Sequence, residues 1–430
     1  MKILIIGSGG REHALSWACN RSSLHPSITC TPGNGGTARF GRNVDISAED
    51  VSQLEDFIRA ERFDLTIIGP EAPAVGGLAD RLIARGFRVF GPSAGAARIE
   101  GSKAFAKQLM IDVGIPTAAY ETFTDVIKAK DYIRSQGAPI VVKASGLAAG
   151  KGAVVCLTVD QALAAVSAML ENGEFGEAGG TVVVEEYLEG VEVSMTAIAD
   201  GTDFLLLPPS RDHKRVFDHD RGPNTGGMGA CSPLSDIPDH LYRTFAEDIL
   251  PKIQKRLDEL GSPFRGVIYP GLMVKDNKFK VLEFNARFGD PETQALLPLL
   301  NKDLLEIMAE VAEGNLSGWR KSHNIEPCEW RKITKPLHSV TVVAASKGYP
   351  GSIQKGFEIT GIPVEEDNRV VFHAGTKAKG NEVVTSGGRV LAVTGLGDTS
   401  LAATETAYEG IGQIRFEGMH YRRDIGRSER

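Results

Sequence analysis

The chain has 430 residues, of which 42% are hydrophobic and 24% charged, and a formal net charge of -7 at pH 7. This length exceeds what one hydrophobic core usually organises, so we expect about two to four packed units. The acidic balance lacks the basic stripe typical of nucleic-acid-binding proteins, so we expect a small-molecule substrate and no nucleic-acid partner.

The first hundred residues alternate short apolar runs with helical patterns. Strands are predicted at 2–6, 64–68 and 88–90, and helices at 11–19, 49–59 and 78–84. This βαβ rhythm predicts an open parallel sheet, in which ligands bind beyond the carboxyl ends of the strands. The first apolar run, residues 3–6, is too short for a signal-peptide core or a membrane span, so no membrane partner is expected.

A glycine-rich loop, residues 7–10 (GSGG), follows the first strand and opens the first helix. Free backbone N–H groups and the helix dipole can bind a phosphate at such a position. The alternative interpretation is a tight turn between strand and helix. Glu12 stands where the dinucleotide-binding fingerprint has its third glycine, so the loop is not that fingerprint.

The next segment predicts helices at 102–112 and 125–135 and a buried strand at 139–143. Lys143 ends this strand, and a loop of small residues at 144–152 follows, which can close over a triphosphate. The loop lacks the spacing and the Ser or Thr of a Walker A motif. The alternative is a flexible hairpin with an exposed Lys151.

An antiparallel sheet is predicted from strands at 181–187, 191–199 and 204–207, which have little helix between them. An acidic connection at 185–190 is followed by Glu192. Extended backbone in such a connection can read an adenine edge, while a nearby carboxylate holds ribose hydroxyls. A solvated acidic turn is the competing interpretation.

Residues 209–234 are glycine-rich and charged and have no periodicity, which predicts a long functional loop. Residues 211–215 (RDHKR) and His219 suggest a metal site at first sight. Together with residues 224–229 (NTGGMG), they favour instead a loop that binds anions and polar substrates through Lys, Arg and open backbone N–H groups.

A helix through 241–257 with a kink at Pro251 and strands at 265–274 and 278–285 are predicted next. Glu283 and Asn285 alternate on the second strand, so their oxygen donors share one face, which suits Mg²⁺. Arg287 follows and supplies a guanidinium for a phosphate or carboxylate. Half-buried polar strand residues explain this isolated pattern equally well.

The last part of the chain predicts a linker at 314–338, strands at 339–345 and 389–394, and a helix at 400–411. The chain therefore reads as a multidomain protein of α/β and α+β type. Its five cysteines are far apart and never form CxxC, so neither a disulfide framework nor a zinc site is indicated. A reducing cytoplasm is the expected location.

In this order, the motifs resemble those of the ATP-grasp enzymes and, within them, of the glycinamide ribonucleotide synthetase family. The resemblance spans essentially the whole chain. It is carried further by residues 9–14 (GGREHA), 69–73 (GPEAP), 101–105 (GSKAF), 212–215 (DHKR), 222–229 (GPNTGGMG), 287–294 (RFGDPETQ), 372–376 (FHAGT) and 387–389 (GGR). The chain departs from the family pattern at Ser145, usually Asp, and at Val191, usually Glu. Residues 321–336 fit the pattern poorly.

The resemblance implies an N-terminal open parallel α/β domain that binds substrate at 1–101. It implies ATP-grasp lobes at 102–320, with a flexible lobe at about 120–190, and a small C-terminal α+β domain at 321–430. ATP would lie between the lobes.

The resemblance also implies roles for individual residues. ATP would be bound by Lys103, Lys143, Gly146, Gly150, Lys151, Gly152, Glu185, Glu186, Tyr187, Leu188 and Glu192. The substrates would be surrounded by Gly9, Gly10, Arg11, Glu12, Asp212, Lys214, Asn224, Thr225, Gly226, Arg287, Gly289 and Asp290. Glu283 and Asn285 would hold Mg²⁺ or Mn²⁺, and the catalytic residues would be Lys103, Lys143 and Arg287.

The implied reaction is an ADP-forming carbon–nitrogen ligation in purine biosynthesis. It joins glycine to 5-phosphoribosylamine through a glycyl phosphate and gives glycinamide ribonucleotide, ADP and phosphate. The alternatives are another ATP-grasp carboxylate–amine ligase and a non-catalytic nucleotide-binding module. Residues 209–229 and 287–294 favour glycine, and the combination of Glu283, Asn285 and two lysines favours catalysis. We expect the enzyme to be a monomer.

Overall fold

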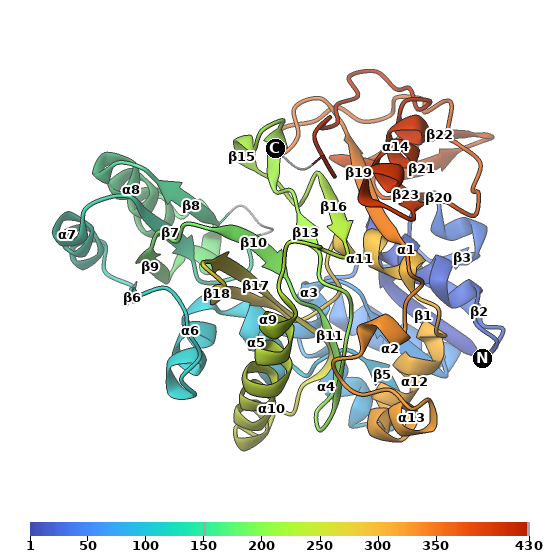
Figure 1. The fold of residues 1–430 in the computed structure, drawn as a ribbon, viewed down its shortest axis with the longest axis horizontal. Coiled ribbons are helices and arrows are strands. Elements are labelled where there is room, and N and C mark those ends of the chain that lie inside the picture. The colour runs from blue at the N-terminus through green and yellow to red at the C-terminus, as the bar shows by residue number, and fades with distance from the viewer. Residues whose placement is uncertain (149–151, 428–430) are drawn as a thin grey trace.

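The computed structural model describes residues 1–148 and 152–427 of the chain. Within these ranges the strands form four larger sheets and two separate hairpins. Figure 1 shows the flexible lobe, which contains β6 to β9, projecting to one side of the remaining sheets. Gly150 and Lys151 lie outside the described residues.

The N-terminal sheet is parallel, as predicted, with the strand order β3-β2-β1-β4-β5. All residues of β4 and all but the first of β1 are buried, as in parallel sheets that are covered on both faces. The loops after β1, β2 and β4 therefore meet at one sheet edge. The elements are β1 (Lys2–Gly7), α1 (Gly10–Asn20), β2 (Ser27–Pro32), β3 (Gly41–Asn43), α2 (Val51–Glu61), β4 (Leu65–Ile68), α3 (Glu71–Val75), α4 (Leu78–Ile83), β5 (Val89–Phe90) and α5 (Ala94–Gly101).

The central sheet is antiparallel and is built on the long hairpin of β17 (Arg265–Lys275) and β18 (Lys278–Asn285). The strand expected at 191–199 is broken into β10 (Val191–Ser194) and β11 (Ala197–Asp200), because each pairs with a different half of β17. β12 (Phe204–Leu206) completes the sheet beside β11.

The flexible lobe is a separate antiparallel sheet with the strand order β6-β9-β7-β8 and its own small core. α6 (Lys103–Asp112) precedes it along the chain. The lobe consists of β6 (Tyr120–Phe123), α7 (Val126–Gln136), β7 (Ile140–Ala144), β8 (Ala153–Cys156), α8 (Val159–Val166) and β9 (Val182–Glu186).

The expectation of a long loop at 209–234 is wrong, because the segment contains four short strands. β14 (Arg215–Phe217) and β15 (Arg221–Asn224) form a hairpin. β13 (Arg211–Asp212) and β16 (Gly229–Ser232) instead join the C-terminal sheet, where β16 pairs with β19. Strands this short show no local period, and the β19 partner of β16 lies more than a hundred residues later in the sequence.

The helix predicted at 241–257 consists of α9 (Asp239–Thr244), a π-helical turn (Phe245–Ile249) and α10 (Leu250–Glu259). Proline has no N–H to continue an α-helical hydrogen-bond ladder. The predicted kink at Pro251 is therefore observed as a π-helical turn that lies just before this proline.

The C-terminal sheet has the order β13-β16-β19-β23-β20, and α14 (Ser400–Ile411) packs on β19 and β23. The prediction of a linker at 314–338 is wrong for its first residues, because α12 (Leu304–Glu313) is followed there by a further helix, α13 (Leu316–Ser322). α13 buries Leu316 and Trp319 in the main core. The remaining elements are α11 (Glu292–Leu296), β19 (His338–Ala345), β20 (Arg369–His373), β21 (Thr376–Lys379), β22 (Glu382–Thr385) and β23 (Arg389–Gly397).

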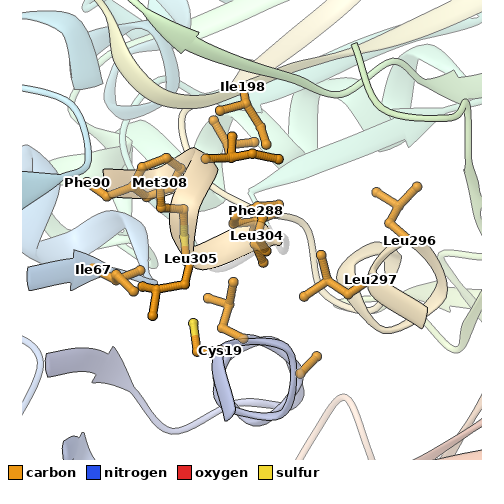
Figure 2. Close-up of a cluster of buried hydrophobic side chains, with 14 of the residues drawn as sticks. Cys19, Ile67, Phe90, Ile198, Phe288, Leu296, Leu297, Leu304, Leu305 and Met308 are labelled. Carbon is orange, nitrogen blue, oxygen red and sulfur yellow. The ribbon is translucent and has the colours of Figure 1, made fainter. Parts of the chain in front are cut away.

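One apolar core joins the N-terminal, central and C-terminal parts of the molecule. Figure 2 shows Ile67 and Phe90 of the N-terminal sheet packed with Leu305 and Met308 of α12, and Ile198 of the central sheet nearby. The shared core therefore fixes the position of these parts relative to one another. No helix within the described residues has the length and apolar character that crossing a membrane requires.

Candidate active site

A cleft of about 390 Å³ opens between the N-terminal sheet edge, α6, the β17–β18 hairpin and the flexible lobe. Most of the predicted site residues line it, although they come from distant parts of the chain. They are Arg11, Lys103, Lys143, Gly152, Glu192, Asp212, Lys214, Asn224, Thr225, Gly226, Glu283, Asn285, Arg287 and Asp290.

Lys143 lies in the cleft at the end of β7 and forms an ion pair with Glu185 on the neighbouring strand β9. Lys107 on α6 lies 2.5 Å from the other carboxylate oxygen of Glu185 and donates to Thr117 Oγ1 at 2.7 Å. Burial lowers the pKa of Lys107. Both oxygens of the Glu185 carboxylate are thus paired with lysines.

The connection after β9 is anchored on both sides. Glu186 donates its backbone N–H to the carbonyl of Ala119 at 2.8 Å, and its carboxylate lies 2.8 Å from the Lys280 ammonium. Tyr187 and Leu188 follow and are half-buried. None of these three predicted residues lines the cleft itself.

Lys103 is the first residue of α6, at the edge of the cleft, and its position depends on Ser145. Lys103 donates its backbone N–H to the Ser145 carbonyl at 2.8 Å, and the Ala104 N–H donates to Ser145 Oγ at 3.1 Å. Gly146 packs against Ala178, where an added Cβ would lie only 2.6 Å from the Ala178 Cα. Burial lowers the pKa of the Lys103 ammonium.

Glu283, near the end of β18, is surrounded by ammonium groups. Burial disfavours its charged form, but Lys214, Lys143 and Lys103 outweigh that effect and lower the pKa of Glu283 to about 2. The carboxylate is therefore ionised at any physiological pH. Lys143 and Lys214 also pair with Glu185 and Glu192, so these ammonium groups are held in the cleft, where they can contact an anionic ligand such as a polyphosphate.

Lys214 lies 3.9 Å from Glu283 and also pairs with Glu192 on β10. Burial opposes its charge, but Glu192 and Glu283 raise the pKa of Lys214 well above the ordinary value. Lys214 is therefore a cation held between Glu192, which is predicted to contact ribose, and Glu283, which is predicted to hold a metal.

The oxygen donors of Glu283 and Asn285 fit Mg²⁺ or Mn²⁺ as a partner of phosphate. Glu283 is ionised, and Asn285 Oδ1 accepts only a long 3.4 Å hydrogen bond from Arg287. Mg²⁺ commonly takes one or two protein oxygens and fills its shell with water and substrate phosphate. Within the described ranges, no group of three or more His, Cys, Asp or Glu side chains is arranged to hold a metal alone.

Arg287 is held in place by acids from the N-terminal part of the chain. Its guanidinium lies 2.9 Å from Glu100 and 3.2 Å from Glu71, and it donates to the Tyr269 hydroxyl at 3.3 Å. Burial opposes the charge of Arg287, but Glu100 and its neighbours raise the pKa well above the ordinary value. The predicted catalytic guanidinium is thus rigid and permanently charged.

The first glycine loop is shaped by Glu12, which is buried. Glu12 accepts a hydrogen bond from the Gly9 N–H at 2.6 Å and forms a 2.5 Å ion pair with Arg11. Gly10 has no room for a side chain, because an added Cβ would collide with Gln294. Glu12 and Gly10 therefore support the loop. Arg11 lines the cleft, and Gly9 lines a second, neighbouring hollow.

A second hollow of about 320 Å³ adjoins the cleft and is lined by Gly9, Asn34, Asp290 and Arg389. Arg389 of β23 lies 3.2 Å from Asp290 and donates to the carbonyls of Asp290 and Gly226, both at 2.5 Å. One guanidinium therefore ties β23 of the C-terminal sheet to residues 226 and 290 at the site.

Asp212 and Glu292 form an acidic corner of the cleft. Burial and the charge of Glu292 raise the pKa of Asp212 well above its ordinary value, and burial also raises the pKa of Glu292. Asp212 Oδ1 is buried and has no hydrogen-bond partner among the described residues. Gly289 lies against Glu292, since an added Cβ would be 2.5 Å from Glu292 Oε2. This corner offers acceptors for an amino group.

The chain is similar in sequence to proteins of one known family. Three family profiles, described as the N, ATP-grasp (A) and C domains of phosphoribosylglycinamide synthetase, match residues 1–100, 101–293 and 339–428. The chain belongs to the phosphoribosylglycinamide synthetase family. Two similar relatives are phosphoribosylamine–glycine ligases: one from Nostoc sp. is 47% identical over 99% of both chains, and one from Escherichia coli K12 is 46% identical over 99% of this chain and 98% of its own.

Solved structures agree with this family. A phosphoribosylamine–glycine ligase from Thermotoga maritima superposes with a TM-score of 0.84 and 35% identity, covering 99% of this chain and 100% of its own. A biotin carboxylase domain from Hydrogenobacter thermophilus has a TM-score of 0.75 but only 15% identity, covering 98% of this chain and 91% of its own. The latter shows a shared fold only.

Several residues of the phosphoribosylglycinamide synthetase cleft were not predicted. Lys107 lies one helical turn after Lys103 on α6, a spacing that places both on one helix face. Glu71 and Arg389 stand inside motifs that were recognised, but their roles depend on contacts with Arg287 and Asp290. Glu100, Tyr269 and Glu292 also line the cleft and were not predicted.

Proposed function

We propose that this chain catalyses the ATP-dependent ligation of glycine to 5-phosphoribosylamine. The products are glycinamide ribonucleotide, ADP and phosphate, and the reaction serves purine biosynthesis in the cytoplasm. The observation that carries the proposal is the convergence of Lys103, Lys143, Lys214 and Glu283 in one cleft of a member of this family.

The domain division 1–101, 102–320 and 321–430 and the predicted site residues belong to this proposal. The cleft between α6 and the flexible lobe would bind ATP. The second hollow, which is lined by Gly9 and Arg389, would bind the phosphoribosyl group. Bound Mg²⁺ or Mn²⁺, held by Glu283 and Asn285, would neutralise charge on the phosphate oxygens.

In the first step, a glycine carboxylate oxygen attacks the γ-phosphorus of ATP, and ADP leaves. No side-chain nucleophile is needed, because phosphoryl transfer depends on alignment and on stabilisation of charge. Lys103 and Lys143 hold the phosphates, and the rigid Arg287 guanidinium orients the carboxylate. Buried acids hold Lys143 and Arg287 in place before substrate arrives, so these two cations need little reorganisation during the reaction.

In the second step, the amine of phosphoribosylamine attacks the glycyl phosphate carbonyl carbon, and phosphate leaves. The amine loses a proton as the amide bond forms. We assign the acidic corner of Asp212 and Glu292 to hold amino groups next to the reacting carbon, because Asp212 Oδ1 has an open acceptor position. The flexible lobe would exclude water, which would otherwise hydrolyse the acyl phosphate.

The test is an assay of ADP release with glycine and freshly prepared phosphoribosylamine, each omitted in turn. We expect full ADP release only with both substrates and formation of the amide in equal amount. Bicarbonate and formate in place of glycine are the matched controls for other ATP-grasp reactions. ADP release that follows bicarbonate or formate, or that ignores phosphoribosylamine, would overturn the proposal.

A further inference from the structure

The hairpin of β14 and β15 connects the cleft to the C-terminal tail of the chain. Its base carries Lys214 and Asn224 into the cleft, while its turn faces residues 420–424. His219 and Asp220 in the turn have φ values of 58° and 49°, a left-handed conformation that non-glycine residues adopt only at a cost. Contacts from outside the hairpin are therefore needed to hold this turn in a single conformation.

Arg422 of the tail supplies those contacts from a position that is 1% exposed. It donates to Asp220 Oδ1 at 2.6 Å and to the Arg215 carbonyl at 3.1 Å. It also forms a bidentate pair with Asp424 at 2.8 and 2.6 Å. One guanidinium therefore contacts both the turn and the first strand of the hairpin.

The neighbours of Arg422 strengthen the same attachment. Asp424 accepts the His219 N–H at 2.9 Å, and the Arg423 N–H donates to Asp218 at 2.7 Å. The Tyr408 hydroxyl donates to the Arg422 carbonyl at 2.9 Å, which anchors the tail on α14. The hairpin is thus fixed to the folded C-terminal part of the molecule.

The attachment reaches the cleft through one peptide. The carbonyl that Arg422 contacts belongs to Arg215, the residue directly after Lys214. Thr225 then donates its N–H and its hydroxyl to the Lys214 carbonyl at 2.7 and 2.8 Å. A displacement of the hairpin would therefore move Lys214 and Thr225 together.

We propose that Arg422 is a positioning residue, which sets Lys214 and residues 224–226 in the cleft by clamping the β14–β15 hairpin to the C-terminal tail. This inference rests on the proposed function, because it assigns these residues to the glycine and phosphoribosylamine side of the cleft. The planar guanidinium reaches three separate acceptors at fixed angles, so lysine cannot replace it. Arg422 touches no substrate and acts through the hairpin.

The test compares Arg422→Lys and Arg422→Met with the control Arg423→Met, in which a neighbouring exposed arginine is replaced. We expect kcat/KM for glycine and for phosphoribosylamine to fall ~10- to 100-fold in both Arg422 variants, since small displacements of positioning groups cost about that much. The KM for ATP should change less than kcat/KM for the other two substrates, because Lys214 reaches the ATP side of the cleft only through Glu192 and Glu283. Arg423→Met should behave as the parent enzyme does.

Amide hydrogen exchange gives a readout that does not need the reaction. In both Arg422 variants, peptides from 213–228 should exchange faster than in the parent, whereas peptides from α14 should not change. If Arg422→Met fails to fold, Asp220→Asn removes the negative charge from one partner of the clamp, a side chain that is 67% exposed. In that variant, the increase in exchange at 213–228 and the loss of kcat/KM should both be smaller than in the Arg422 variants but equally selective.

Parent-like kcat/KM and exchange in folded Arg422 variants would overturn the clamp. So would equal losses for all three substrates together with faster exchange throughout α14, because that pattern indicates a general structural role. A parent enzyme without glycine-dependent ADP release would overturn the proposed function instead. The selective change in exchange at 213–228 would still support the clamp in that case.

Discussion

The ammonium group of Lys107 lies 2.5 Å from a carboxylate oxygen of Glu185, and both side chains are 2% exposed. Lys143 pairs with the second oxygen of the same carboxylate. One buried acid therefore balances two buried lysines at the junction of α6 and the flexible lobe. Removing the acid would leave both lysines without their nearest counter-charge.

We expect Glu185→Gln to lower the free energy of unfolding by ~3–5 kcal/mol, the usual cost of leaving a buried charge unpaired. The matched control is Glu186→Gln, because the adjacent Glu186 pairs with Lys280 at 2.8 Å with both side chains more than 40% exposed. Such an exposed pair contributes about 1 kcal/mol or less. Thermal unfolding of both variants checks the difference, and equal shifts would contradict the role given to the buried pair.

Glu283→Gln should lower turnover by about 100-fold or more, since removing one electrostatic group from a phosphoryl-transfer site has an effect of that size. The glutamine keeps the shape of the side chain but removes the charge that faces three lysines. Glu189→Gln is the control, because Glu189 pairs with Lys275 on the same hairpin at an exposed position. Steady-state ADP release is the measurement, and turnover within twofold of the parent would refute the assignment.

Acid should destabilise the junction between the N-terminal and C-terminal parts through His373. Burial, helped by the charge of Arg39, lowers the pKa of His373 to about 4, compared with 6.5 in an unfolded chain. Below pH 6.5 the unfolded chain takes up a proton that the folded protein excludes. The contribution of neutral His373 is thus fully present above pH 6.5 and is lost as the pH falls toward 4.

The fall in melting temperature between pH 6.5 and 5 should therefore be shallower in His373→Asn than in the parent. His25→Asn is the control, because His25 is exposed and has a φ of 44°, which asparagine tolerates. Parallel pH profiles for the parent and His373→Asn would show that this histidine does not account for the acid sensitivity.

The sequence predicted the elements that have a strong local period and missed those made by distant pairing. The buried run of β4 and the helix at 400–411 were predicted from their own residues. β16 was missed, because its four residues acquire strand structure by pairing with β13 and with β19, which lies more than a hundred residues later. In the same way, the signal for Lys143 was the strand before it, whereas Glu100 is recognised only through its contact with Arg287.

The proposed reaction makes a prediction that does not depend on any side chain. A carboxylate is a poor acceptor for an amine, so one of its oxygens must first receive a phosphoryl group that can leave. The ammonium groups of Lys103, Lys143 and Lys214 around Glu283 suit transfer of a γ-phosphoryl group to that oxygen. The bond that breaks in the second step is then the one between the glycine carbon and that same oxygen.

Glycine labelled with heavy oxygen at both carboxylate positions should therefore give inorganic phosphate with one heavy oxygen per molecule, and the amide product should keep the other. Mass spectrometry of phosphate, nucleotide and amide measures all three fates, and unlabelled glycine in heavy-oxygen water controls for exchange with solvent. Activation through an adenylate would instead place the label in AMP and release pyrophosphate. Labelled AMP, or phosphate without label, would overturn the acyl-phosphate mechanism and with it the assignment of Lys103 and Lys143 to a transferring γ-phosphoryl group.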